Sequence, residues 1–281
     1  MSEEVGDSKK KQLTNKDKLI YASGQVPGMF FGSFMGQIQA FYYAWMGLNF
    51  RYIFIAQIIY ALWNAINDPI FGVLQDRTNR EDGRYIPWIR WFAPFFTIAF
   101  ITVFFPPQTW RYKTGGEEYQ VLLATWYVIT QILYDTGFTI VYIAHVSLAP
   151  QMTMNEQERT SLQIYNTIAG LIGMGLSAAF PLIFLTEPNE TKIMWFQITV
   201  VIFGILGFFP WIWIWKNIQE KKEFIPPKEN QSSFWENIKH VFNNPSGRAH
   251  VFYDGISVGI FNCIIAGITF AFTWIFGLSE E

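Results

Sequence analysis

The chain has 281 residues, of which 51% are hydrophobic, 19% aromatic and only 15% charged, and its formal net charge is −2. This composition is typical of a helical protein that crosses a membrane several times and argues against a soluble globular class. A charge so close to zero argues against nucleic acid as a partner. The single cysteine, Cys263, excludes an intrachain disulfide.

Apolar segments long enough to cross a bilayer divide the chain into tail, spans and loops, since a spanning helix needs about 20 apolar residues. Most lysines and arginines outside these segments lie in the N-terminal tail and in alternate loops, which predicts a cytoplasmic N-terminus and, after an odd number of spans, a C-terminus outside. The predicted domains are a tail over 1–18, a six-span bundle over 19–216, a cytoplasmic linker over 217–248 and a seventh span with a short end over 249–281. The seven predicted spans are 20–48, 52–75, 86–105, 119–149, 162–185, 193–215 and 249–277.

The first span carries glycines at positions 24, 28, 32 and 36. Because residues four apart share a helix face, these glycines predict a surface that a neighbouring helix can approach closely. Gln37, toward the outer half of the span, is a candidate to bind a polar solute.

The second span contains Asn64, Asn67 and Asp68 within one helical turn, followed by Pro69. A carboxylate near the middle of a span costs about 2.5–3.5 kcal/mol on insertion scales, so such groups usually face a bundle interior or a watery cavity. We therefore expect Asp68 to line a path. The alternative is that Asp68 is a structural hydrogen-bond anchor.

A charged hinge follows, with the pattern Gly72-x-x-x-Asp76-Arg77 and then Gly83-Arg84. The plainer interpretation of these charges is a solvated cytoplasmic turn that obeys the positive-inside rule.

The fourth span holds Gln131, Asp135, Tyr142 and His145. Asp135 and Tyr142 are seven residues apart, nearly two helical turns, and so fall on one stripe. Asp135 should lie near the midplane, where transporters bind their substrates. His145 is a poor candidate for a metal ligand, because no second histidine, cysteine or carboxylate stands three or four residues away.

Residues 216–248 are rich in lysine, and the segment 233–242 has the pattern of an amphipathic helix at the cytoplasmic membrane surface. The seventh span follows, with Asp254 and Asn262.

Three motifs in this order carry a resemblance to a known family: 67–72 (NDPIFG), 83–89 (GRYIPWI) and 147–150 (SLAP). Together they resemble the glycoside-pentoside-hexuronide/cation symporters of the major facilitator superfamily and their relatives, the sodium-coupled lysophospholipid symporters. The resemblance implies an all-α integral membrane fold, namely the N-terminal six-helix bundle of that superfamily plus a seventh transmembrane helix.

The resemblance also implies roles for individual residues. Acidic residues in the family's second span help bind the coupling cation, which assigns that role here to Asp68 with Asn64 and Asn67. Of the family's two acidic positions in this span only Asp68 keeps its carboxylate, since the other is Asn64, and a further acid of the family's first span matches at or near Gly28. The cation site is therefore depleted and suits a proton, or sodium with help from the Asn64 amide, at Asp68. The acid of the family's fourth span matches Tyr142, two turns from Asp135, so either the register differs or the acid has moved. The implied substrate-binding residues are Asp135, Tyr142, His145 and Gln37, and the implied cytoplasmic gate is Gly72, Asp76, Arg77, Gly83 and Arg84.

The expected function is secondary active, cation-coupled symport of a small solute, a sugar or glycoside, by alternating access. The chain would be an incomplete or half-length form, a truncation or a split-gene product, whose partners are the solute, the lipid bilayer and a missing C-terminal half or second half-chain. The alternatives are a lysolipid symporter of the same superfamily and a non-transporting membrane scaffold or remnant. No His-Glu-x-x-His or Walker pattern is present, and we expect neither an enzyme nor an ATP-driven pump, and no cofactor beyond the coupling ion.

Overall fold

The structure, a computed structural model, describes residues 13–110, 117–184, 190–220, 239–240, 242–253, 256–257 and 260. The chain forms two compact units, Met1–Ile225 and Pro226–Glu281. The boundary falls inside the predicted linker. In the second unit the described residues are almost all helical, and the predicted seventh span and amphipathic helix lie largely outside the described residues.

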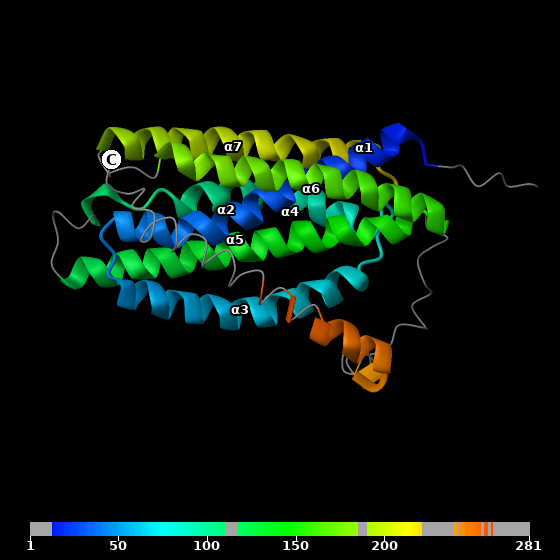
Figure 1. The fold of residues 1–281 in the computed structure, drawn as a ribbon, viewed down its shortest axis with the longest axis horizontal. Helices are drawn as coiled ribbons and strands as arrows, with labels where there is room; N and C mark the ends of the chain where they lie inside the picture. The colour runs from blue at the N-terminus through cyan, green and yellow to red at the C-terminus, as the bar shows by residue number, and fades with distance from the viewer. Residues whose placement is uncertain are drawn as a thin grey trace, which may run out of the picture. The chain divides into compact units, whose positions relative to one another are not determined.

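The first unit is built from α-helices, with no strand among its described residues. The helices run side by side along the molecule, with α3 at one edge and α6 and α7 toward the opposite edge (Figure 1). Their bounds are α1 Asn15–Ser23, α2 Gln25–Trp45, α3 Phe50–Asp76, α4 Ile86–Val103, α5 Glu117–Met152, α6 Glu156–Phe184 and α7 Glu190–Asn217, with a short 3₁₀ turn, η1, over Gln108–Trp110.

The predicted first span is two helices, because α1 ends at Ser23 and α2 begins at Gln25. Gly24 between them keeps a helical conformation, with φ −69° and ψ −21°. Pro27 explains the division, since its ring has no N–H and clashes with the carbonyl of the residue four positions earlier. The other spans of the first unit agree with their helices to within a few residues at most ends. The start of α6 lies six residues before the predicted one.

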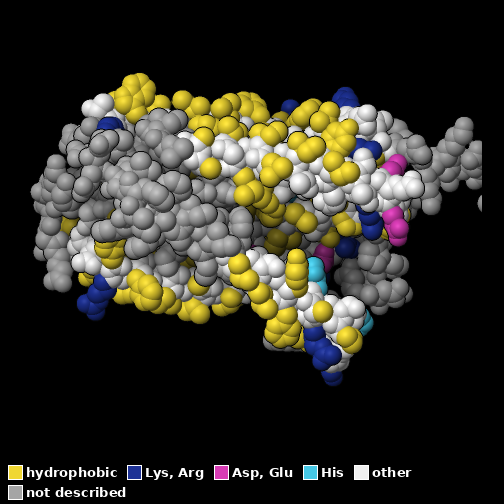
Figure 2. Space-filling view, viewed as in Figure 1, with side chains coloured by type: hydrophobic (Ala, Val, Ile, Leu, Met, Phe, Trp, Pro, Cys, Tyr) yellow, Lys and Arg dark blue, Asp and Glu magenta, His cyan; other side chains and the backbone are white. Residues whose placement is uncertain are grey.

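Three helices of the described chain are long and apolar enough to cross a membrane, namely Ile86–Val103, Tyr119–Met152 and Thr191–Asn217. α2, α3 and α6 are longer than 20 residues but are interrupted by glycines and by polar side chains such as Gln39 and Asp68. On the face seen in Figure 2, hydrophobic side chains are spread along the length of the bundle, whereas its visible charged side chains lie toward the two ends.

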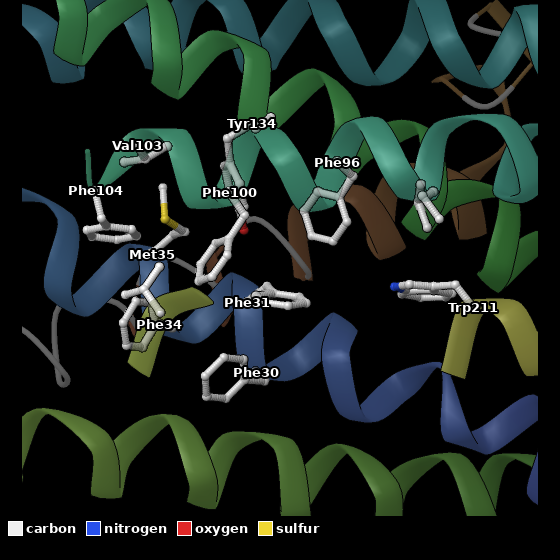
Figure 3. Packing of buried hydrophobic residues seen from close by; sticks show 14 of the residues in the cluster. Phe30, Phe31, Phe34, Met35, Phe96, Phe100, Val103, Phe104, Tyr134 and Trp211 are labelled. Carbon is white, nitrogen blue, oxygen red and sulfur yellow. The ribbon is translucent and has the colours of Figure 1, made fainter. Parts of the chain in front are cut away.

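The core of the first unit is aromatic. Phe31 of α2 is fully buried against Phe96 and Phe100 of α4, with ring centroids 5.1 and 4.5 Å away, and the rings converge between the two helices in Figure 3. Offset and edge-on ring pairs of this kind contribute about 0.5–1.5 kcal/mol beyond the area they bury. This packing fixes α2 against α4, while α5 packs on α4 and α3, and α6 packs on α2.

The predicted glycine surface is in part a packing surface. A Cβ atom at Gly24 or Gly28 would meet side chains within 3 Å, whereas one at Gly36 would meet nothing within 4 Å. The closest backbone approach is made by Gly173 of α6, where a Cβ would lie 2.3 Å from the carbonyl oxygen of Val26. α2 and α6 can therefore pack at this distance only without a side chain at position 173.

Candidate functional site: a polar cavity between α2, α3 and α5

The polar residues of α3 meet an aspartate on α5. Asn64 Nδ2 donates to Asp135 Oδ1 at 3.2 Å, and Asn67 Nδ2 donates to Asp135 Oδ2 at 2.9 Å. Both amides lie on the same side of α3, because residues 64 and 67 are three apart along the helix. The Asp135 carboxylate, only 2% exposed, is thus held by two amide donors from the neighbouring helix.

Thr139 connects this aspartate to the second carboxylate. Its hydroxyl accepts from Asn67 Nδ2 at 3.0 Å and donates to Asp68 Oδ1 at 2.8 Å. Asp68 and Asp135 therefore belong to one hydrogen-bonded network, which also contains Asn64, Asn67 and Thr139. Asp68 is exposed in the first unit, in contrast to Asp135.

Both carboxylates border a cavity of about 340 Å³, a size within the range of ~300–1,000 Å³ that small-molecule sites occupy. Three helices supply the wall, and its side chains alternate between hydrogen-bonding groups and aromatic or small apolar ones. The lining residues are Gly32, Met35, Gly36, Gln39 and Ala40 of α2, Gln57, Tyr60, Asn64 and Asp68 of α3, and Gln131, Tyr134, Asp135, Phe138, Thr139, Tyr142 and Ile143 of α5.

Polar atoms at this wall lack partners within the described structure. Gln39 Nε2 and Gln131 Oε1 are buried and make no hydrogen bond there, and the same holds for Oδ1 of Asn67, which does not itself line the cavity. A buried amide group without a partner costs about 1–3 kcal/mol. A bound polar solute or ordered water would supply the missing partners.

The described residues hold no cluster of three or more histidine, cysteine or acidic side chains that could bind a metal ion. The site instead offers two carboxylates with hydroxyl and amide oxygens. This donor set can bind a proton, and hard cations such as sodium prefer oxygen ligands.

Comparison with known proteins identifies the chain's family. The family model for MFS/sugar transport proteins matches residues 20–280. The chain belongs to this family of the major facilitator superfamily.

Its relatives are symporters. The chain is 25% identical to the inner membrane symporter YicJ of Escherichia coli (strain K12) over 97% of its own length and 57% of the relative's. It is 26% identical to the putative glycoside/cation symporter YagG of the same strain, over 70% of this chain and 41% of the relative. It is 27% identical to the sodium-dependent lysophosphatidylcholine symporter 1 of Gallus gallus, over 60% of this chain and 31% of the relative.

The predicted family and the all-α membrane fold are confirmed, and the protein is an integral membrane protein. The family is one of transporters and not of enzymes. The chain spans about half the length of the curated relatives it matches.

Gly28 and Tyr142, which the resemblance matches to acidic positions of the family's first and fourth spans, lie against each other. A Cβ atom at Gly28 would be 2.7 Å from Cε2 of Tyr142, so the tyrosine ring occupies the space beside the glycine. The Tyr142 hydroxyl accepts a hydrogen bond from Gln25 Nε2 at 3.1 Å. The acidic group of α5 that reaches α3 is Asp135, and the structure thus groups this predicted substrate residue with the predicted cation-binding residues.

His145 and Gln37 do not line the cavity. His145 is fully buried one turn beyond Tyr142, stacked on Tyr21 at 4.6 Å, with its Nε2 2.8 Å from the Tyr21 carbonyl oxygen. The cavity glutamine of α2 is Gln39, two residues beyond the predicted Gln37. Its signal was its spacing, because 32, 36 and 39 follow the i, i+4, i+7 pattern of one helix face.

The predicted gate residues come together in part. The Tyr85 hydroxyl donates to Asp76 Oδ1 at 2.7 Å, and Arg84 Nη1 lies 4.0 Å from the same oxygen. Burial, followed by this hydrogen bond, raises the pKa of Tyr85 to about 12, so the hydroxyl keeps its proton at physiological pH. Arg77 is exposed at the end of α3, and a Cβ at Gly72 would meet nothing within 4 Å.

Several contributors to these sites were not predicted from the sequence. Thr139 and Tyr60 belong to the cavity, and Glu220 contacts the hinge from the chain that follows α7. Each depends on contacts between distant segments, which no local pattern records.

Proposed function

We propose that the protein is the N-terminal half of a secondary active transporter that couples uptake of a small polar solute to a cation. The observation that carries the proposal is the pair of carboxylates, Asp68 and Asp135, joined through Thr139 and Asn67 at the wall of one cavity. Polar groups inside a membrane bundle are costly and usually mark an ion or substrate pathway.

The cation binds in this proposal between Asp68 and Asp135. A proton needs only one carboxylate, whereas sodium would take several oxygens and could add those of Thr139 and Asn67. Asn67 Oδ1 is buried without a hydrogen-bond partner in the described structure, and the Nδ2 of the same side chain bonds to both Asp135 and Thr139. The coupling ion is a proton or sodium, and the experiment below separates the two.

The solute class follows from the rest of the wall. The amides of Gln39, Gln57 and Gln131 offer donors and acceptors, and Tyr142 and Phe138 present stacked rings, with centroids 5.2 Å apart. Such a combination suits a polyhydroxylated molecule, and we propose a sugar or glycoside. A relative named for glycoside/cation symport supports this class.

Alternating access requires two halves that rock around a central site. The relatives are about twice as long as the aligned part, and Asp68 at the cavity wall is exposed in the first unit. We propose that a second half, carried by further chain or by a separate chain, completes the cavity. The N-terminus is cytoplasmic in this proposal and the C-terminus of this chain lies outside, as the charge distribution predicts.

The test is uptake of a labelled glycoside into proteoliposomes that contain this chain with its second half. Asp68→Asn and Asp135→Asn should each abolish uptake driven by an inward ion gradient, while Glu156→Gln, an exposed acid at the start of α6, should not. Separate pH and sodium gradients identify the ion. Uptake unaffected by either aspartate substitution would reject the proposed ion site, and no uptake by the native chain with its second half would favour a scaffold.

A lysolipid symporter is the second candidate, because a relative named for lysophosphatidylcholine symport matches 60% of this chain. Competition decides between them. If labelled lysophosphatidylcholine is taken up and unlabelled glycoside does not compete with it, the proposed substrate class is wrong while the coupling proposal stands.

A further inference from the structure

The backbone N–H groups at the N-terminus of α4 find few hydrogen-bond acceptors within the helix. The first backbone N–H groups of a helix have no partner within it. The N-cap residue, Tyr85, makes no side-chain cap bond, and Pro87 has no N–H. Trp88 and Ile89 donate to the Tyr85 carbonyl, which leaves the amides at and before Ile86 to be satisfied from elsewhere.

Glu220 satisfies them. Its Oε1 accepts from the backbone amides of Tyr85 and Ile86, and its Oε2 accepts from that of Arg84, all at 2.7 Å. Hydrogen bonds to an ionised acceptor are about twice as strong as neutral ones. The negative charge also stands at the positive end of the α4 dipole. One side chain from beyond α7 thus holds three consecutive amides more than 130 positions earlier in the chain.

Gly83 makes this approach possible. Its φ of +120° is in the region that favours glycine. A Cβ atom there would also lie 2.5 Å from Glu220 Oε1. The glycine of the Gly83-Arg84 motif is therefore required both by the backbone conformation and by the carboxylate beside it.

We propose that Glu220 is the positioning residue of the cytoplasmic hinge, defined as residues 77–85. By holding the backbone of Arg84 and Tyr85, it places the two side chains that pair with Asp76 at the end of α3. It also ties the hinge to the chain leaving α7, so that movement of that chain is transmitted to the α3–α4 connection. This inference goes beyond the proposed function, and its tests below read backbone protection and position, so it can fail while the transport proposal stands.

Hydrogen exchange of the complete 281-residue chain in detergent tests the three bonds directly. Glu220→Ala should speed exchange of the amides at 84, 85 and 86 by at least ~10-fold, because charge-assisted bonds are lost. Glu220→Gln keeps one oxygen acceptor and should release mainly the Arg84 amide. Glu81→Ala removes an exposed hinge acid and should change none of them. Equal protection at 84–86 in Glu220→Ala and the native chain would overturn the proposal.

A double-mutant cycle tests the contact with Gly83. Gly83→Ala should lower the unfolding temperature more in the native chain than in the Glu220→Ala chain, because the clash with the carboxylate disappears while the strain at φ +120° remains. Additive effects would contradict the contact.

A distance measurement separates positioning of the hinge from local capping of a helix. Spin labels at Asn79 and Lys216, both exposed, are introduced with Cys263 replaced by Ser. The distance distribution should be narrow in the native background, broad with Glu220→Ala and intermediate with Glu220→Gln. An unchanged distribution in Glu220→Ala would show that Glu220 only caps α4, and the positioning role would be rejected.

Discussion

Asn67→Ala is the substitution that most sharply probes the network at the cavity. Asn67 is fully buried, and its single Nδ2 group donates both to Asp135 and to Thr139. A hydrogen bond to a charged group contributes about 1.5–3 kcal/mol. An interhelical hydrogen bond between neutral groups in a membrane protein averages about 0.6 kcal/mol. Losing both bonds should lower the free energy of unfolding by about 2–4 kcal/mol.

The matched control is Asn64→Ala, which changes the same residue type one turn away on the same helix. Asn64 is only half-buried and makes one longer bond, 3.2 Å, to Asp135. We expect a loss of about 1 kcal/mol or less for this variant, since its partner keeps the bond from Asn67. Equilibrium unfolding of the purified chain in mixed detergent micelles measures both. Equal losses for the two variants, or a loss below about 1 kcal/mol for Asn67→Ala, would refute the network as described.

Three further outcomes follow from the geometry. Gly173→Ala should destabilise the chain by at least about 1–3 kcal/mol because its new methyl group meets the α2 backbone. Gly175→Ala, two residues away in open space, should be neutral or stabilising by up to about 1 kcal/mol, and similar unfolding temperatures for the two variants would contradict the α2–α6 packing. Tyr85→Phe should cost about 1 kcal/mol at pH 8. The folded-state pKa of Tyr85 is raised from 10.0 to about 12, so the difference in unfolding free energy between the two chains should hold below pH 10 and vanish as the pH rises through about 12. A difference that does not depend on pH would argue against the hydroxyl bond. Gln39→Leu should weaken solute binding at least ~10-fold through loss of a cavity amide, whereas Gln37→Leu should not. A binding titration that shows the larger loss of affinity in Gln37→Leu would mean that the other face of α2 lines the cavity.

The sequence predicted which polar side chains lie inside the bundle, but it did not predict which residues they contact. Exposing a carboxylate and two amides to lipid within one helical turn costs free energy. The interior location of Asn67 and the cavity location of Asp68 therefore followed from solvation alone. The partner of these amides did not follow. Asp135 meets them only because α3 and α5 pack in one particular register, which depends on side chains along both helices.

The same limit explains the differences on α2 and at the hinge. Gln37 and Gln39 are two residues apart and so point to nearly opposite sides of the helix. Only the glycine spacing indicates which side faces α5. Glu220 lies in a stretch whose composition predicts a solvated linker. Its three bonds to the amides at the start of α4 cannot be predicted without the fold.

Transport as proposed requires that the two carboxylates border a water-filled cavity that binds the coupling ion. The most direct test is thiol labelling of single cysteines at Gln39, Asp68 and His145, in a background with Cys263 replaced by Ser and with a membrane-impermeant reagent. We expect labelling at 39 and 68 and no labelling at 145, where the side chain is fully buried. Protection of position 68 from the reagent in the absence of solute, or labelling of 145 as fast as 68, would contradict it.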